Sequence, residues 1–383
     1  MDFIIFGDDW GGHASTTQHL VRHFFEVDRV IWVDSIGMRT PRLNRKDLTR
    51  LKVKACSLTT KKAARQLQQK DPETDCEITA CQFFHIAPMV VPFHQNNLCR
   101  FLNKWILQIQ ILRAMKLMGM AVPNILSANP VVANYIQGIP YRKLAYLRLD
   151  RYAELPGVDR DLILEVEPLM FDQAALIFAT ARKLIPQQTV WEKKSYYLPQ
   201  GVDTVHFAQA SCEPSRKKIL GFFGLVAEWL DFTLIEMIAT NMQDWILEFR
   251  GPIRCLPERL KKIKNVRWLP PVPFNDLPFV MKDWACAWIP FQVSALTESV
   301  NPLKIREYLA AGLASHCTSL PEVYAMKNCP GVFISDSPQE IEEWMESCFH
   351  CDSREKRIKI RAGVTDESWT NRVIQLQRVI TQG

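Results

Sequence analysis

Short apolar runs rich in β-branched and aromatic residues alternate with helix-forming segments along the whole chain, and this alternation constrains the fold more than any other feature. Strands that are separated by helices are typical of parallel sheets with crossover helices. The sequence therefore predicts an α/β protein. The expected strands are residues 2–7, 29–34, 78–86, 124–128, 143–149 and 176–181, and then 217–224, 245–251, 265–270, 286–291, 314–319 and 331–336. The expected helices include 15–25, 95–118, 231–241, 302–311 and 338–351.

The run LPQGVDTVHFAQASCEPSRKK interrupts this alternation with prolines, a glycine and polar side chains. A chain of 383 residues is also too long for one ordinary hydrophobic core. We therefore expect two Rossmann-like domains, residues 1–200 and 201–365, connected near residues 200–215. Ligands bind at the carboxyl ends of the strands in such sheets, so we expect one in the cleft between the domains.

Composition predicts a globular protein, because 48% of the residues are hydrophobic and 23% are charged. No apolar run reaches the length of about 20 residues that a transmembrane helix needs. Asp2, Asp8 and Asp9 stand where a signal peptide has its basic start and apolar middle, so we expect none. Eleven scattered cysteines indicate a reducing compartment, and we expect a cytoplasmic protein.

Basic residues gather in the segment 39–70, which contains eleven Lys and Arg and one acid. Such a segment is by default an exposed, solvated surface. It is followed by residues 98–118, where basic residues alternate with large apolar and aromatic ones. This pattern is typical of a helix on a membrane surface, and a helix packed on the core with its cations at the rim explains it as well. Stacking aromatics are scarce in 39–70, so we expect no nucleic-acid partner.

In each half, one glycine turn follows the first expected strand. GDDWGGHAST, residues 7–16, contains Gly11 and Gly12 before a helix, where backbone amides could approach an anion. A glycine turn with a Ser15 or Thr16 helix cap is the alternative. The second turn ends at Gly224, and Glu228 lies in the loop that follows it. Together the two turns suit a ligand that carries phosphates.

The stretch TESVNPLKIREYLAAG predicts a helix with Asn301 as N-cap and Gly312 as its stop. Lys304 lies in the first turn, where the helix dipole disfavours a cation by roughly 0.3–1 kcal/mol. Glu307 follows on the same stripe. A phosphate bound by Lys304 and the first amides, with Glu307 accepting ribose hydroxyls, explains this pattern. A local Lys304–Glu307 ion pair explains it equally well.

The second half contains an ordered series of motifs: GFFGLVAEWLDFTLI, EFRGPI, NVRWLPPVPFNDLPFVM, CAWIPF, ESVNPLKIREYLAAG and ESWTNRV. In order and spacing they resemble the C-terminal half of two-domain glycosyltransferases of the GT-B fold. The chain is most similar to glycosyltransferases of the teichuronic-acid type and, more distantly, to xanthan glucuronosyltransferase. The resemblance implies a nucleotide-sugar donor, with UDP as the expected nucleotide, and a last helix over 366–383 that returns to the first domain.

The resemblance also implies roles for individual residues. Lys304 would contact the diphosphate, Glu307 the ribose, and the segment 269–273, which contains Val272, the base. Many relatives have a second glutamate eight positions before the ribose-binding one, and Ser299 stands there in this chain. The expected donor-binding residues are Gly12, Gly224, Glu228, Arg250, Val272, Ser299, Asn301, Lys304 and Glu307.

Transfer requires a base that takes the proton of the acceptor hydroxyl, and a carboxylate can do so. Asp150 follows an expected strand and resembles the catalytic aspartate of the xanthan enzyme family, which inverts the anomeric configuration. A capping or turn aspartate is the alternative explanation of Asp150. His13 is the second candidate base, and Asp8 or Asp9 is the third. No Asp-x-Asp metal motif stands at a strand end, so we expect neither a metal site nor a cofactor, with Lys304 and helix amides stabilising the leaving diphosphate.

These features predict a glycosyltransferase that moves a hexose or hexuronic acid to a lipid-linked or oligosaccharide acceptor in surface polysaccharide biosynthesis. It would lie at the inner face of the cell membrane, bound through segment 39–70 and helix 98–118. A sugar-nucleotide epimerase of the same fold, or a non-catalytic membrane-peripheral scaffold, are the alternatives.

Overall fold

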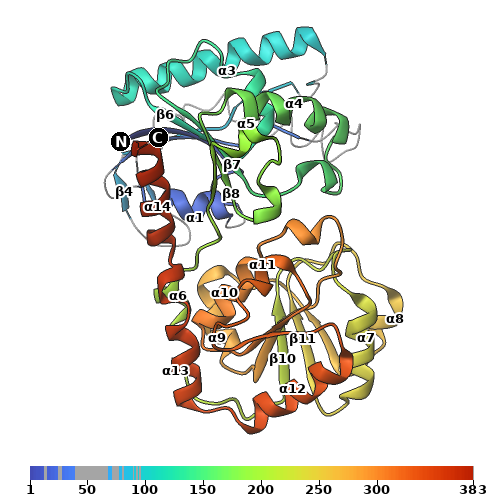
Figure 1. Cartoon of the computed structure of the whole chain (residues 1–383). Coiled ribbons are helices and arrows are strands. Elements are labelled where there is room, and N and C mark those ends of the chain that lie inside the picture. The colour runs from blue at the N-terminus through green and yellow to red at the C-terminus, as the bar shows by residue number, and fades with distance from the viewer. Residues whose placement is uncertain are drawn as a thin grey trace. The chain divides into compact units, whose positions relative to one another are not determined.

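The computed structural model describes residues 1–12, 15–24, 28–38, 82–88, 90–91, 94 and 96–382, together with the backbone of 68–70 and 77–79. The described chain forms two compact units (Figure 1). The first contains Met1–Leu198 and Val373–Gly383, and the second contains Pro199–Arg372. Each unit is a parallel sheet with helices packed on it, so the α/β prediction is confirmed.

The first unit contains a seven-stranded sheet in the order β5-β2-β1-β6-β7-β8-β9, and every neighbouring pair is parallel. Its central strands are buried throughout, which is why they appear in the sequence as continuous apolar runs. The strands are β1 (Asp2–Phe6), β2 (Arg29–Val33), β5 (Phe83–Ile86), β6 (Asn124–Ser127), β7 (Leu144–Arg148), β8 (Leu176–Ala179) and β9 (Ser195–Tyr197). A separate antiparallel pair joins β3 (Gln68–Lys70) to β4 (Glu77–Thr79).

Helices and short 3-10 turns connect these strands. α3 packs against β2 and β5, and α4 packs against η2 and β7. The elements are α1 (Thr16–Arg22), α3 (Asn97–Met118), η2 (Pro130–Asn134), η3 (Tyr152–Glu154), α4 (Arg160–Gln173), η4 (Arg182–Leu184) and α5 (Thr189–Glu192).

The second unit contains a six-stranded parallel sheet in the order β12-β11-β10-β13-β14-β15. The strand order reverses between β10 and β13, and this reversal creates the switch point where ligands bind in doubly wound sheets. The strands are β10 (Ile219–Phe223), β11 (Ile246–Arg250), β12 (Val266–Leu269), β13 (Cys286–Ile289), β14 (Ser315–Cys317) and β15 (Val332–Ile334).

Helices cover both faces of this sheet, and α10 packs against β13, β14 and α13. The elements are α6 (Thr204–Phe207), α7 (Phe232–Asn241), α8 (Glu258–Lys261), η5 (Phe274–Asp276), α9 (Leu277–Met281), η6 (Thr297–Ser299), α10 (Leu303–Ala310), α11 (Pro321–Tyr324), α12 (Pro338–His350), α13 (Arg354–Ala362) and η7 (Thr365–Glu367). The last helix, α14 (Trp369–Gln382), contributes its first residues to the second unit and the rest to the first. Three hydrogen bonds fix that later part, to Tyr197, Asp28 and Lys143.

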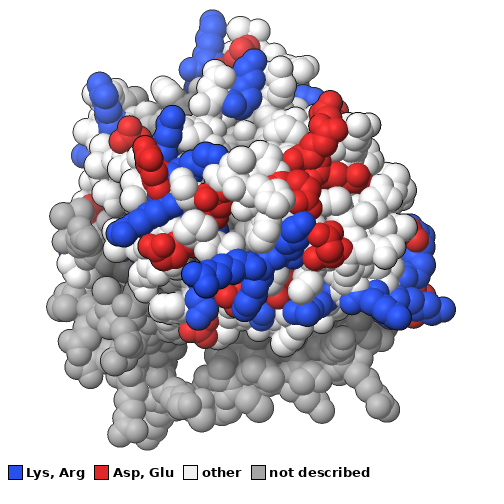
Figure 2. Space-filling model, turned by 90° about the horizontal axis from the view of Figure 1, so that it is seen from below, with Lys and Arg blue, Asp and Glu red and all other residues white. Residues whose placement is uncertain are grey.

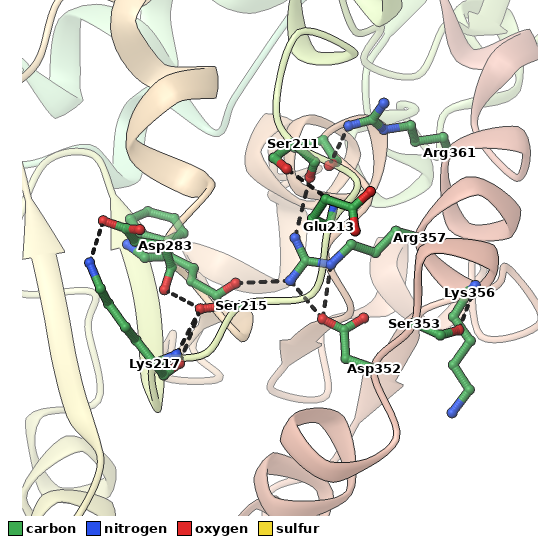
Figure 3. A network of polar contacts seen from close by, with 12 residues as sticks. Ser211, Glu213, Ser215, Lys217, Asp283, Asp352, Ser353, Lys356, Arg357 and Arg361 are labelled. Atoms are coloured by element: carbon green, nitrogen blue, oxygen red, sulfur yellow. Dashed lines mark hydrogen bonds and ion pairs between the residues drawn. The ribbon is translucent and has the colours of Figure 1, made fainter.

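Two arginines of α13 bind the segment that enters the second unit (Figure 3). Arg357 is almost fully buried, donates two hydrogen bonds to Asp352 at 2.9 and 2.7 Å, and donates a third to the Ser211 carbonyl at 3.4 Å. Arg361 donates to the carbonyls of Ala208 and Ala210. Much of the segment expected as a free connection over 200–215 is therefore packed onto the second unit.

The expected strands are all present, with shorter bounds, and one was wrong in extent. Residues 78–86 are not one strand: the start belongs to β4 of the separate hairpin, and only Phe83–Ile86 joins the main sheet as β5. The strand β9 and the helices α4 and α13 were not expected. β9 is three residues long and half-buried, so it lacks the apolar run that marks the other strands.

Candidate active site

The switch point of the second unit is formed where β10 and β13 end. β10 runs directly into Gly224, and the chain after β13 leads through η6 to α10. Gly224 has a φ of +132°, and a Cβ atom placed there would lie 2.3 Å from Lys304 Cε and 2.8 Å from Lys304 Nζ. The structure therefore brings Gly224 and Lys304 together, and the lysine occupies the space that any side chain at position 224 would need.

A second glycine, Gly251, packs closely against the backbone of this turn. Gly251 follows β11 with a φ of +155°, and a Cβ atom there would lie 2.0 Å from the Gly224 carbonyl oxygen. The Gly224 amide donates a hydrogen bond to the Arg250 carbonyl at 2.8 Å. Neither turn has room for a side chain, so the backbone of these two turns lies close to Lys304 and to itself.

α10 begins at Leu303 with Pro302 as its N-cap, and no side chain caps its first turn. The expectation that Asn301 caps this helix was wrong. Asn301 Oδ1 instead accepts a hydrogen bond from Arg306 Nη1 at 2.7 Å, and Arg306 also pairs with Glu367 at 2.9 Å. The expected stop was correct, since Gly312 follows the helix with a φ of +86°. The uncapped first turn leaves its amides available to an anion.

Lys304 and Glu307 do not form the local ion pair that was the alternative explanation. Among the described residues, neither side chain makes a hydrogen bond or an ion pair; Lys304 Nζ lies 5.8 Å from the centre of the Phe222 ring. Burial lowers the pKa of Lys304, although the charge of Glu307 opposes this. Burial raises the pKa of Glu307 to about 7, against the effect of Lys304. A half-buried cation beside a buried carboxyl group, neither with a hydrogen bond or an ion pair among the described residues, is typical of a ligand site.

Other expected donor residues are already engaged. Glu228 pairs with Arg254 at 2.7 Å, and hydrogen bonding from its own backbone amide is the largest of the effects that lower its pKa. Arg250 pairs with Glu248 at 2.7 Å and lines a cavity of about 420 Å³ over β10, β11 and β12. Gly224, Lys304 and Glu307 do not line this cavity. The Arg250 carbonyl thus contacts the Gly224 turn, whereas Arg250 also lines a cavity to which Gly224, Lys304 and Glu307 do not contribute.

Val272 and Ser299 lie in the two loops expected to bind the base and the sugar. Val272 is half-buried and packs against the hydrophobic core of the unit. Ser299, the last residue of η6, is fully buried, and its hydroxyl has no hydrogen-bond partner among the described groups. Burial of an unsatisfied hydroxyl costs about 1–3 kcal/mol, so this loop carries a polar group that its own fold does not satisfy.

In the first unit, the glycine turn after β1 precedes a helix that is already capped. Ser15 is the N-cap of α1 and accepts a hydrogen bond from the Gln18 amide at 3.3 Å. Gly12 donates its amide to the Asp9 carbonyl at 3.1 Å. The alternative reading of this turn, a capped glycine turn, therefore accounts for it. His13, the second candidate base, lies outside the described residues.

Asp150 follows β7 and is half-buried. It does not cap η3, whose N-cap is Arg151, and it makes no hydrogen bond or ion pair with any described residue. Burial, and then the nearby charge of Asp8, raises the pKa of Asp150 to about 7. The capping alternative is thus wrong, and a carboxyl group with a pKa of about 7 gains or loses its proton near neutral pH.

The neighbouring charged groups of the first unit are engaged in hydrogen bonds. Arg148 and Glu167 form an ion pair at 2.8 Å. Asp34, at the end of β2, accepts hydrogen bonds from the Trp10 amide at 2.9 Å and the Trp32 indole at 3.2 Å, and contacts His85 Nε2 at 2.7 Å. The Asp34–His85 contact was not predicted, because its partners come from strands that are far apart in sequence. The carboxyl groups of Asp150 and of nearby Asp8 make no hydrogen bond or ion pair with any described residue.

Among the residues that the structure describes, no cluster of three or more His, Cys, Asp or Glu side chains is arranged to hold a metal ion. Figure 2 shows Lys and Arg side chains interleaved with Asp and Glu on one face, rather than a continuous basic field. No described helix combines the length and apolar character that spanning a bilayer requires. Residues 39–67 of the basic segment lie outside the described residues.

Comparison with characterised sequences gives a partial match. No family model matches the chain. It is 28% identical over 150 residues to the putative teichuronic acid biosynthesis glycosyltransferase TuaH of Bacillus subtilis strain 168. The match covers 36% of this chain and 38% of that protein, so it spans well under half of the relative's length.

Solved structures match over the whole chain. A glycosyltransferase from Rickettsia africae has a TM-score of 0.66 at 12% identity, with 100% of this chain and 99% of that chain covered. The Anabaena protein Alr3699/HepE in complex with UDP-glucose has a TM-score of 0.64 at 12% identity, with 100% of both chains covered. TarM has a TM-score of 0.63 at 8% identity and 100% and 99% coverage. The chain therefore has the GT-B fold that its motifs implied, and it resembles glycosyltransferases of this fold, including one of the teichuronic-acid type.

Proposed function

We propose that this protein is a glycosyltransferase that moves a hexosyl or hexuronosyl group from a UDP-sugar to a saccharide acceptor in surface polysaccharide biosynthesis. The observation that carries the proposal is the switch point of the second unit, where half-buried Lys304 and buried Glu307 lie near the Gly224 turn without a hydrogen bond or an ion pair to any described residue. Complexes of structural neighbours with UDP-glucose, and the description of the Bacillus relative, support the choice of donor and pathway.

The donor would bind with its diphosphate against Lys304 and the uncapped first turn of α10. Burial removes water from the lysine ammonium group, and a phosphate there would replace that water with a charge-assisted hydrogen bond. Glu307, one turn further along, would accept hydrogen bonds from the ribose hydroxyls. The loop that contains Val272 would contact the base, and the unsatisfied Ser299 hydroxyl gives the η6 loop a polar group for the donor sugar.

Asp150 is the proposed general base. Its carboxylate would take the proton of the acceptor hydroxyl while the hydroxyl oxygen forms a bond to the anomeric carbon and the bond from that carbon to the diphosphate breaks. Direct displacement of this kind inverts the anomeric configuration. Lys304 and the α10 amides would stabilise the charge that develops on the leaving diphosphate, so we propose transfer without a metal ion or cofactor.

A lipid-linked acceptor is the proposed substrate, and the inner face of the cell membrane is the proposed location. The eight described cysteines that are free thiols are compatible with a reducing compartment. An epimerase would convert a UDP-hexose into a new UDP-hexose without an acceptor, whereas a transferase releases UDP only when an acceptor is present. A non-catalytic scaffold would keep its cellular function in Asp150→Ala.

A thermal-shift panel of UDP-, GDP- and ADP-sugars tests the proposal. UDP-sugars should raise the melting temperature of the wild type and should have little effect on Lys304→Ala. Lys282→Ala is the matched control, because Lys282 is an exposed lysine of the same unit outside the switch point. If no nucleotide sugar stabilises the wild type, the proposed donor site is refuted. Equal stabilisation of wild type and Lys304→Ala would remove Lys304 from it.

A further inference from the structure

α3 is apolar on two opposite faces. One face packs on β2 and β5 through Leu107, Ile111, Ala114 and Met115, which are all buried. A helix that is apolar all round is expected to be covered on every side, either by protein or by lipid. α3 is instead drawn along the upper edge of the first unit in Figure 1, so its second face requires an explanation.

The second face, called here the outer face of α3, is formed by Leu98, Phe101, Leu102, Trp105 and Leu112. The spacing of three, four and seven residues places these side chains in one stripe. Leu98 is 76% exposed, Phe101 70% and Trp105 58%. Single exposed apolar residues are common on protein surfaces, but a continuous stripe with two aromatic rings marks an interaction surface.

The charge of α3 identifies the partner. The helix contains Arg100, Lys104, Arg113 and Lys116 and no acidic residue. Arg100 pairs with Glu165 at 3.0 Å, and Lys104 donates to the Gln137 side chain at 3.0 Å, so both contact the protein. Arg113 and Lys116 are exposed, and no described residue forms an ion pair with them. An apolar stripe with free cations matches a surface with negative charge above an apolar interior.

We propose that the outer face of α3 docks the protein on a membrane that contains anionic lipids. Phe101 and Trp105 would enter the region between headgroups and acyl chains, and Arg113 and Lys116 would contact lipid phosphates. The helix lies on the membrane and does not cross it, in line with its four cations. A second copy of the chain fits this face less well, because it would bring two cationic helices together without a carboxylate on either.

This surface gives the proposed function its membrane partner, and it can be tested without any sugar transfer. Full-length protein is sedimented with phosphatidylcholine vesicles that contain or lack phosphatidylglycerol, in the absence of nucleotide sugar. The wild type should bind the anionic vesicles and should be released by salt. Phe101→Ser/Trp105→Ser should bind at least about tenfold more weakly, because two interfacial anchors are lost.

Two controls keep the test sharp. Leu164→Ser/Val190→Ser removes exposed apolar side chains of the same unit outside α3, and it should bind as the wild type does. Circular dichroism and the melting temperature establish that each variant is folded. Wild-type binding by folded Phe101→Ser/Trp105→Ser would overturn the proposal. So would a wild-type dimer in sedimentation equilibrium that the same variant converts to monomer, with no vesicle binding by either. A wild-type protein that binds anionic vesicles but transfers no sugar would refute only the catalytic proposal.

Discussion

Asp150→Asn should abolish transfer and at the same time stabilise the protein at alkaline pH. The pKa of Asp150 rises from an ordinary 3.8 to about 7 on folding, mainly through burial. Each pKa unit corresponds to about 1.4 kcal/mol, so the ionised carboxylate destabilises the fold by at most about 4 kcal/mol. Asp150 is only half-buried, and solvent screening lowers this cost to about 2 kcal/mol.

The effect depends on pH in a defined direction. Below about pH 4 the carboxyl group is protonated in both the folded and the unfolded chain, and asparagine should change little. Between about pH 4 and pH 7 only the folded chain retains the proton, so the cost of the aspartate grows with pH, and above pH 7 it is complete. Asp150→Asn should therefore melt roughly 4–8 °C above the wild type at pH 8 and at the same temperature at pH 4.

Melting curves of wild type and Asp150→Asn across this pH range measure the effect, and acceptor-dependent UDP release measures activity. Wild-type activity should rise with pH through about 7 as the base ionises. Asp161→Asn, an exposed aspartate of the same unit, is the control and should show no pH-dependent gain. A melting temperature for Asp150→Asn that equals that of the wild type at pH 8 would show that Asp150 is not held in an unfavourable environment.

Three further predictions concern the donor site. Gly224→Ala should weaken UDP-sugar binding at least tenfold, because the new methyl group displaces Lys304. Gly157→Ala is the control: Gly157 also has a positive φ but lies in open space, so its substitution should cost only about 1–3 kcal/mol of backbone strain. Calorimetric titration measures the loss of binding, and melting curves measure the loss of stability. Glu307→Gln should stabilise the fold at pH 8, where the raised pKa of Glu307 makes its ionised form costly, and should weaken binding of UDP more than that of inorganic diphosphate in a titration. Treatment with EDTA should leave the initial rate of UDP release unchanged. If EDTA abolishes UDP release and added Mg²⁺ restores it, transfer is not metal-independent.

The fold was largely predictable because its strands are buried on both faces. Parallel strands of this kind are written in the sequence as apolar runs, and β1, β2, β10 and β11 were all expected within two residues of their bounds. The same reasoning missed β9, because a short, half-buried edge strand has no such run.

The candidate site was predictable where the chemistry was local. Lys304 was identified because a cation in a first helical turn conflicts with the helix dipole. The structure shows no ion pair between Lys304 and a described carboxylate, although the charge of Glu307 favours the protonated lysine. The capping prediction failed because a nearby charged residue competes for the side chain. Asn301 does not cap α10 because Arg306, five positions along the chain, donates a hydrogen bond to it. The ion pair of Arg250 with Glu248, two positions back on the same strand, was not predicted either.

The stacked turns at Gly224 and Gly251 have a consequence for specificity. The amides of both glycines donate to backbone carbonyls, so in the proposed enzyme these turns give the donor room to approach but no side chain that could distinguish glucose from glucuronic acid. Discrimination between donors must then come from side chains around this surface, with the η6 loop and its Ser299 hydroxyl as the first place to alter. In the proposed enzyme the two glycines would serve any donor sugar equally well. Attempts to change the sugar that is transferred should therefore leave both glycines unchanged.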